Sequence, residues 1–107
     1  MTDKQRRQIL KEIPRTVRDD LRHVMSTTRG RRFVRHIIYD VCKLEGVSYA
    51  SHANDTAFRE GQRKVGSMLQ SLVQLVTPQE FTAMMAEKLQ EDMERLEDTF
   101  PEENLDE

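Results

Sequence analysis

The sequence predicts an all-α protein, a small bundle of four helices with an antiparallel helical hairpin at its C-terminal end. Three observations predict this fold class. Apolar residues recur at three- and four-residue spacing along most of the 107-residue chain, which is the period of one face of an α-helix. No long stretch alternates apolar and polar residues as a half-buried strand does. Helix-capping signals separate the periodic stretches.

Three parts are expected along the chain. Residues 1–14 form an N-terminal arm, which is expected to be a frayed helix because chain ends are ordered only where they dock. Residues 15–98 form the helical domain. Residues 99–107 form a short acidic tail, and its composition predicts disorder.

The first two helices are predicted over residues 16–27 and 28–45. In the first, Thr16 is the expected N-cap and Asp19 stands at the capping-box position three residues on. The second begins in the basic stretch "TTRGRR". It is expected to end before Gly46, a residue that suits a left-handed C-terminal cap.

The last two helices are predicted over residues 55–76 and 78–98, after the polar loop "VSYASHAND". Gly61 and Gly66 interrupt the third helix, and each costs roughly 1 kcal/mol against Ala. Close approach of a neighbouring helix would offset that cost. The stretch "TPQE" opens the fourth helix, with Thr as the cap, Pro in the first turn and Glu completing the box. This tight turn predicts the antiparallel hairpin.

The periodic faces define the expected core. Cys42, the single cysteine, lies in an apolar run and is interpreted as a small buried hydrophobe rather than a nucleophile or metal ligand. Nine further apolar residues are predicted to be largely buried: Phe33, Ile37, Val41, Phe58, Leu69, Leu72, Phe81, Met85 and Leu89.

Charge is distributed unevenly between the two parts of the chain. The formal net charge is only −2. Residues 1–64 carry 15 Lys/Arg and 8 Asp/Glu, for a net charge of +7, whereas residues 65–107 carry 2 and 11, for −9. Such an asymmetry favours contact with a charged partner, or neutralisation within the fold or between copies.

No enzyme signature is present in the sequence. His23, His36 and His52 have no spacing to Cys, Asp or Glu that resembles a zinc site, and neither a phosphate-binding glycine loop nor a nucleophile elbow occurs. We therefore expect no enzymatic activity, cofactor, metal or small-molecule substrate. The sequence has no run of about 18 apolar residues, so no membrane span is predicted. No signal peptide is expected.

Basic residues gather where a helix begins, although the partial positive charge of a helix N-terminus disfavours cations there. We expect these arginines to meet an anion outside their own helix, either an acidic helix of another copy or a phosphate backbone. A solvated face balanced by the fourth helix is the alternative. The predicted partner- or phosphate-binding face comprises Arg29, Arg31, Arg32, Arg35, Arg59, Arg63 and Lys64. Its predicted acidic complement comprises Glu87, Glu91, Glu94 and Asp98.

The stretches "GRRFVRHIIYDVCKLEGV" and "DTAFREGQRKVGSMLQSLV", followed by an acidic helix that contains methionines, carry a family resemblance. Over roughly residues 25–97 the chain resembles small phage virion-associated proteins typified by a Bordetella phage protein of the Bbp series, encoded among the virion genes of short-tailed phages. The resemblance implies a helical protein of virion assembly, the capsid interior, or the tail and ejection apparatus, and it implies no activity. Its anchor residues are Gly30, Arg31, Gly46, Phe58, Gly61, Arg63 and Gly66.

Two functions fit these observations. The preferred one is a non-enzymatic structural protein of the virion, present in the host cytoplasm during assembly. It would dock through helical faces to portal, tail or ejection components, with other virion proteins and further copies of itself as partners. The alternative is a small DNA-binding protein that uses the basic face, with "STTRG" as a helix-turn-helix turn. The following helix, "FVRHIIYDV", is strongly apolar and leaves few side chains to read bases.

Overall fold

The computed structural model describes residues 2–46 and 53–99, and within these ranges every regular element is helical. The all-α prediction is therefore confirmed. The elements are α1 (Asp3–Glu12), α2 (Arg15–Met25), α3 (Thr28–Arg35), the π-helical stretch η1 (His36–Val41), α4 (Ala53–Val76) and α5 (Pro78–Thr99). The predicted tail, apart from Thr99, and residues 47–52 of the predicted loop lie outside the described residues.

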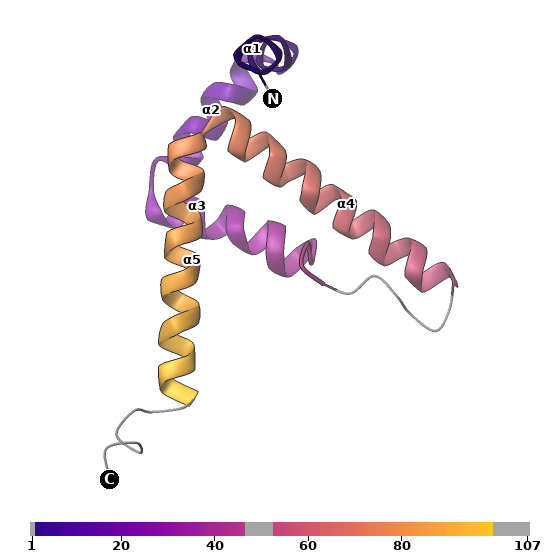
Figure 1. The fold of residues 1–107 in the computed structure, drawn as a ribbon, viewed down its shortest axis with the longest axis vertical. Helices are drawn as coiled ribbons and strands as arrows, with labels where there is room; N and C mark the ends of the chain where they lie inside the picture. Colours follow the sequence, from indigo (N-terminus) through magenta and orange to yellow (C-terminus); the bar gives the residue numbers. More distant parts are fainter. Residues whose placement is uncertain (1, 47–52, 100–107) are drawn as a thin grey trace.

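The helices splay apart instead of packing along their whole lengths as a bundle. In Figure 1, α4 and α5 meet at one end and diverge as a V, with α3 and η1 lying between them. The Cα radius of gyration is 17.5 Å, against about 13 Å for a compact chain of this length. Neither the predicted four-helix bundle nor the closed antiparallel hairpin is therefore confirmed.

The N-terminal arm forms the regular helix α1. A capping box opens it, since the Thr2 hydroxyl accepts from the Gln5 amide at 3.2 Å and the Gln5 side chain accepts from the Thr2 amide at 2.9 Å. These bonds satisfy amides that a helix start leaves unpaired. Arg6 ties α1 to α4, because its Nη2 donates to the carbonyl of Leu75 at 2.9 Å. No residue of α1 is buried.

The predicted start of the first domain helix is wrong by one residue. α2 begins at Arg15 directly after Pro14, and no side chain caps it. Thr16 and Asp19 therefore lie inside the helix, and the expected capping box is not formed. Asp19 instead pairs along the helix with Arg22 at 3.2 Å and with Arg15 at 3.8 Å.

The corner between α2 and α3 depends on a glycine. The Thr27 hydroxyl caps α3 by accepting from the Gly30 amide at 3.0 Å. A Cβ added to Gly30 would lie 1.7 Å from the carbonyl oxygen of Val24, the next-to-last residue of α2. Only a residue without a side chain therefore allows the two helices to meet at this corner.

The second predicted helix ends earlier than expected, at Val41 rather than residue 45. Its last turns widen into η1, where the Cys42 amide donates to the Ile37 carbonyl at 2.8 Å. Lys43 takes the left-handed conformation with φ 52°, and no glycine in the described residues has positive φ. The predicted left-handed cap at Gly46 is therefore wrong, because Lys43 makes the turn three residues earlier.

The two glycines of α4 have opposite surroundings. A Cβ on Gly66 would lie 2.9 Å from the Cβ of Cys42 and 3.3 Å from the Ile38 carbonyl oxygen, so close helix approach is confirmed there. A Cβ on Gly61 would have no atom within 4 Å. The same prediction for Gly61 is wrong, because Gly61 lies on the exposed side of α4, whereas its neighbour Gln62 contacts η1 by donating from Nε2 to the Val41 carbonyl at 2.6 Å.

The turn between α4 and α5 begins the last helix as predicted, at Pro78. The predicted side-chain cap does not form, because the Thr77 hydroxyl donates to the Val73 carbonyl at 2.8 Å and so extends the end of α4. The Thr77 carbonyl accepts from the Phe81 amide at 2.8 Å. Thr77 is 2% exposed, so its polar atoms need these partners.

The buried core is small and lies where the helices converge. Its members are Met25, Ile38, Cys42, Val73, Val76 and Met84. The predicted burial of Cys42 is thus confirmed.

Of the nine predicted core residues, five are half-buried: Ile37, Leu69, Leu72, Phe81 and Met85. The prediction is wrong for the other four, because a closed bundle was needed to cover them. They are Phe33, Val41, Phe58 and Leu89, with exposed fractions of 62%, 52%, 71% and 61%.

Candidate interaction surfaces

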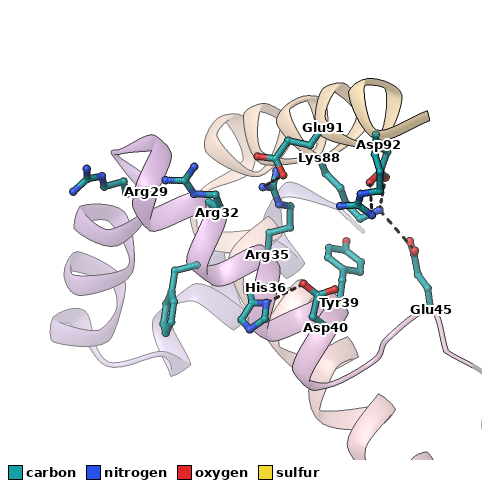
Figure 2. Close-up of a pocket in the computed structure, with 12 residues that line it drawn as sticks. Arg29, Arg32, Arg35, His36, Tyr39, Asp40, Glu45, Lys88, Glu91 and Asp92 are labelled. Carbon is teal, nitrogen blue, oxygen red and sulfur yellow. Dashed lines mark hydrogen bonds and ion pairs between the residues drawn. The ribbon is translucent and has the colours of Figure 1, made fainter. Parts of the chain in front are cut away.

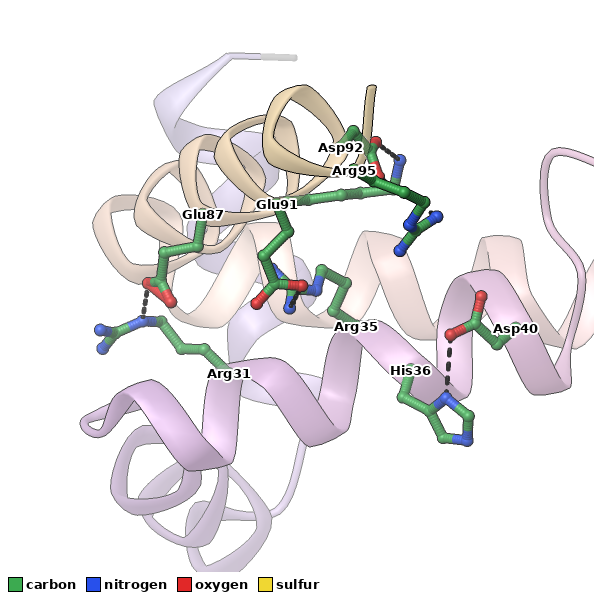
Figure 3. Close-up of polar contacts among 9 residues, drawn as sticks. Arg31, Arg35, His36, Asp40, Glu87, Glu91, Asp92 and Arg95 are labelled. Atoms are coloured by element: carbon green, nitrogen blue, oxygen red, sulfur yellow. Dashed lines mark hydrogen bonds and ion pairs between the residues drawn. The ribbon is translucent and has the colours of Figure 1, made fainter. Parts of the chain in front are cut away.

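Two of the four α3 arginines pair with the acidic helix of their own chain. Arg31 Nε lies 2.6 Å from Glu87 Oε1, and Arg35 Nη2 lies 2.7 Å from Glu91 Oε2 (Figure 3). Both pairs join residues 56 positions apart, so α3 and α5 advance by the same four-residue step across the contact. These arginines do meet anions outside their own helix, and the anions belong to the same molecule.

Arg31 also explains a cation at the start of a helix. Its Nη1 donates to the carbonyl of Met25 at 3.0 Å, and its Nη2 donates to the Thr28 hydroxyl at 3.2 Å. Met25 ends α2, and the last carbonyls of a helix lack intrahelical partners and carry partial negative charge. The favourable end of α2 therefore compensates for the unfavourable start of α3.

Arg35 is the more deeply buried of the paired arginines. Its side chain is 8% exposed, whereas that of its partner Glu91 is 47% exposed. Its Nη1 atom is buried and has no hydrogen-bond partner. A cation in such a place depends on its remaining partner, because an uncompensated buried charge is strongly unfavourable.

The other two arginines, Arg29 and Arg32, border a hollow of about 610 Å³ between α3, η1 and α5. Both are exposed, and Phe33 borders the same hollow. Figure 2 draws no contact to either arginine, and no ion pair joins them to another residue of the described chain. Their charges are therefore left available to a partner.

Most other polar side chains around this hollow are paired with one another. His36 Nδ1 lies 2.9 Å from Asp40 Oδ2, and Lys88 Nζ lies 3.2 Å from Asp92 Oδ2 (Figure 2). Lys88 Nζ also lies 5.2 Å from the ring centre of Tyr39, within cation–π range.

Tyr39 forms one wall of the hollow and reaches across to α4. Its hydroxyl donates to the Gln70 side chain at 2.6 Å. Burial of the side chain, and secondarily the negative charge of Glu45, raise the pKa of the Tyr39 phenol above its usual value of 10.0. The phenol is thus neutral at physiological pH and serves as a hydrogen-bond donor.

The seven predicted basic residues are not brought together as one face. Arg59 and Arg63 line a different hollow of about 630 Å³, next to Lys43 and Phe58. Lys64 borders a third hollow with Arg63. The α4 cations are therefore separated from Arg29 and Arg32.

The predicted acidic complement is divided in the same way. Glu87 and Glu91 are used inside the chain. Glu94 accepts from Gln90 at 3.2 Å on the exposed side of α5. Asp98 is exposed near the end of α5, and no cation of the described residues pairs with Glu94 or Asp98.

Two apolar stripes are exposed, although Phe58 and Leu89, one from each stripe, were predicted to be core residues. On α4 the stripe comprises Phe58, Val65 and Met68, with exposed fractions of 71%, 50% and 63%. On α5 it comprises Leu89, Met93 and Leu96, with 61%, 49% and 60%. Spacings of seven, four and three residues match a helix-pairing seam. This spacing can be seen in the sequence, but the same spacing is also typical of a helix face that packs into a core.

Among residues 2–46 and 53–99, no three side chains of His, Cys, Asp or Glu are arranged to hold a metal ion. In the same ranges, none of the helices has the length and apolar character needed to cross a bilayer.

A family model described as Bbp19-like phage protein matches residues 21–86, which is more than half of the chain. The chain belongs to the Bbp19-like phage protein family. The phage family expected from the sequence is thereby confirmed, and the protein is phage-associated. The family match runs from α2 into α5 and stops just before Glu87. No curated protein and no solved structure matches the chain.

Proposed function

We propose that this protein is a non-enzymatic structural component of a phage virion, which docks through exposed helical faces to a portal, tail or ejection component. It would be present in the host cytoplasm during assembly and in the finished particle. Membership of a phage protein family supports the setting. The pairing of most polar side chains around the hollow between α3, η1 and α5 supports a structural rather than a chemical role.

The observation that carries this proposal is the apolar stripe of α4. Phe58, Val65 and Met68 are all at least half exposed on one helix. Monomeric soluble proteins rarely expose large contiguous apolar patches, and such patches mark contact sites. Exposed phenylalanine and methionine side chains on one helix are typical of a surface that is buried against another protein.

The DNA-binding alternative has less support. Arg31 and Arg35 are committed to Glu87 and Glu91, and the cations of α4 lie at separate hollows. The phosphate contacts that drive non-specific DNA binding need several available cations on one face.

The test measures how much of the chain is incorporated into phage particles. Particles are purified from infections in which the gene carries Phe58→Glu with Val65→Glu, and the chain is quantified in them by mass spectrometry. We expect the unaltered chain in the particles and a loss of at least about tenfold for the variant, with unchanged helical circular dichroism.

Ser67→Glu is the matched control, because Ser67 is also exposed on α4 and lies outside the apolar stripe. It should be incorporated normally. Absence of the unaltered chain from particles, or equal incorporation of the double variant, would refute the proposal.

A further inference from the structure

We propose that the protein associates with itself head to tail, through two surfaces that are complementary but lie on different parts of the molecule. The arginine patch comprises Arg29, Arg32 and Phe33 on α3. The distal ridge comprises Met93, Glu94, Leu96, Glu97 and Asp98 on α5. The ridge of one copy docks on the patch of the next. This contact is separate from the α4 stripe and has a different partner, so it stands or fails independently of the proposed virion contact.

The first support is the register of α3 and α5 within one chain. The ion pairs join residues 56 positions apart. At the same sequence offset, the residue of α5 opposite Arg29 is Met85 and the residue opposite Arg32 is Lys88. Neither of these is an anion. The acidic residues beyond Glu91 also lack an oppositely charged residue at this offset. Glu94, Glu97 and Asp98 correspond to Ile38, Val41 and Cys42, none of which is a cation.

The charges that remain unpaired are therefore of opposite sign, since they are arginines on α3 and carboxylates on α5. Within one molecule, two arginines pair with two glutamates. The same register offers no partner to the remaining arginines and carboxylates. Two arginines remain on α3, one before and one between the paired arginines, and three carboxylates remain on α5 beyond Glu91. A second copy, displaced along this contact, supplies what the first lacks.

Each leftover charge cluster also has an apolar centre. Phe33 is 62% exposed beside Arg29 and Arg32, and all three border the same hollow. Met93 and Leu96 are 49% and 60% exposed among the ridge carboxylates. Aromatic and arginine side chains dominate the energy of protein contacts, so the patch has the composition of a contact site.

The shape of the molecule leaves both surfaces accessible. Figure 1 shows the distal part of α5 projecting beyond α3, away from the place where the helices converge. Because the two surfaces differ, the contact is heterologous, and successive copies close into a ring or extend as a filament.

A second copy fits the arginine patch better than nucleic acid does. Four carboxylates, those of Asp40, Glu45, Glu91 and Asp92, border the same hollow as Arg29 and Arg32. Glu91 and Asp92 are paired with Arg35 and Lys88, so Arg29 and Arg32 alone remain available on this patch, and two cations are few for the several phosphate contacts that hold nucleic acid. A helix presents its carboxylates at discrete positions and can place them beside the arginines alone.

The experiment measures the mass of the purified full-length chain by light scattering over a range of concentrations, at low and at moderate salt. We expect the mass to rise with concentration and the association to weaken with salt, because exposed charges are screened. Arg29→Glu with Arg32→Glu should raise the dissociation constant at least about tenfold, which corresponds to about 1.4 kcal/mol. Glu94→Lys with Glu97→Lys should do the same.

Mixing the two double variants is the decisive step. Every contact between unlike chains then joins opposite charges, so the mixture should regain the mass that each variant alone has lost. Loss of fold or of a nucleic-acid site would not be repaired by mixing.

Matched controls carry the same charge change elsewhere. Arg7→Glu with Lys11→Glu, and Glu12→Lys with Asp20→Lys, alter exposed residues of α1 and α2 and should associate normally. Phe58→Glu with Val65→Glu should also associate normally, which separates this contact from the virion contact. A monomer at every concentration, a mixture that stays monomeric, or retention of random duplex DNA that only the arginine variant abolishes would overturn the inference.

Discussion

Gly66 and Gly61 lie five residues apart on α4, and replacing each one tests the packing of that helix against η1. Gly66→Leu introduces a side chain whose Cβ would lie 2.9 Å from the Cβ of Cys42 and 3.3 Å from the Ile38 carbonyl oxygen. Gly61→Ala introduces a Cβ with no atom within 4 Å. The two substitutions share the helix and the loss of a glycine, and they differ in what the new atoms meet.

The magnitudes follow from two opposing terms. Removing a glycine from a helix interior stabilises it by about 0.5–1 kcal/mol. At Gly66 this gain is offset by overpacking, which typically costs about 1–3 kcal/mol. The opposing atoms there are a Cβ and a backbone carbonyl, which cannot rotate away as the end of a long side chain can. Gly66→Leu should therefore lower the free energy of unfolding by about 1–2 kcal/mol, and Gly61→Ala should raise it by about 0.5–1 kcal/mol.

The assay is urea and thermal unfolding followed by circular dichroism. For a domain of this size, about 1 kcal/mol shifts the midpoint temperature by about 4–8 °C, so the two variants should shift in opposite directions by a readily measured amount. A midpoint for Gly66→Leu that holds steady or rises would show that Gly66 faces solvent. A fall for Gly61→Ala would show that α4 is covered at that position in solution.

The remaining predictions concern a corner, an ion pair and a phenol. Gly30→Ala should lower the free energy of unfolding by more than about 2 kcal/mol, because its Cβ would lie 1.7 Å from a carbonyl oxygen of the preceding helix; urea unfolding measures this, and a change below about 0.5 kcal/mol would refute the corner geometry. Glu87→Gln should lower the free energy of unfolding by about 1–2 kcal/mol, because it weakens the 2.6 Å contact with Arg31, whose side chain is 17% exposed. The difference in free energy of unfolding from the wild type should narrow in high salt. An unfolding midpoint equal to that of the wild type at low salt would contradict the prediction. The phenol of Tyr39 should titrate by ultraviolet absorbance above pH 10.0. Since the folded pKa lies above the unfolded one, its contribution to stability is complete below the unfolded pKa and is lost as pH rises through the folded pKa. Tyr39→Phe should flatten that alkaline decline, and an unchanged decline would assign it to other groups.

The sequence located the arginines of α3 correctly as a feature that needed an explanation. Helical period and the known charge of a helix start predicted that the arginines of α3 meet an anion outside their own helix, with a solvated face balanced by the fourth helix as the alternative. They were also sufficient to name Glu87 and Glu91 as acidic complements. Whether the same molecule or another copy supplies these partners could not be decided from the sequence, because it depends on where α5 lies against α3. For Arg29 and Arg32 the same reasoning leaves the partner to be tested.

The sequence by itself determined what depends on neighbours along the chain. The all-helical class, the start of α5 at Pro78 and the phage family all follow from local period, capping chemistry and motif. The early end at Val41 was not foreseen, because the widened turn of η1 forms against the distant helix α4.

Only the tertiary structure decided which apolar faces are covered. A three-and-four spacing marks a stripe on a helix but does not say what lies opposite it. Phe58 and Leu69 lie on the same helix with similar hydrophobic character, yet Phe58 is exposed and Leu69 is half-buried. The difference arises from the angle at which α4 and α5 diverge from their common turn. That angle is set by packing around Val73, Val76 and Met84, so it involves residues far from the stripe whose burial it determines.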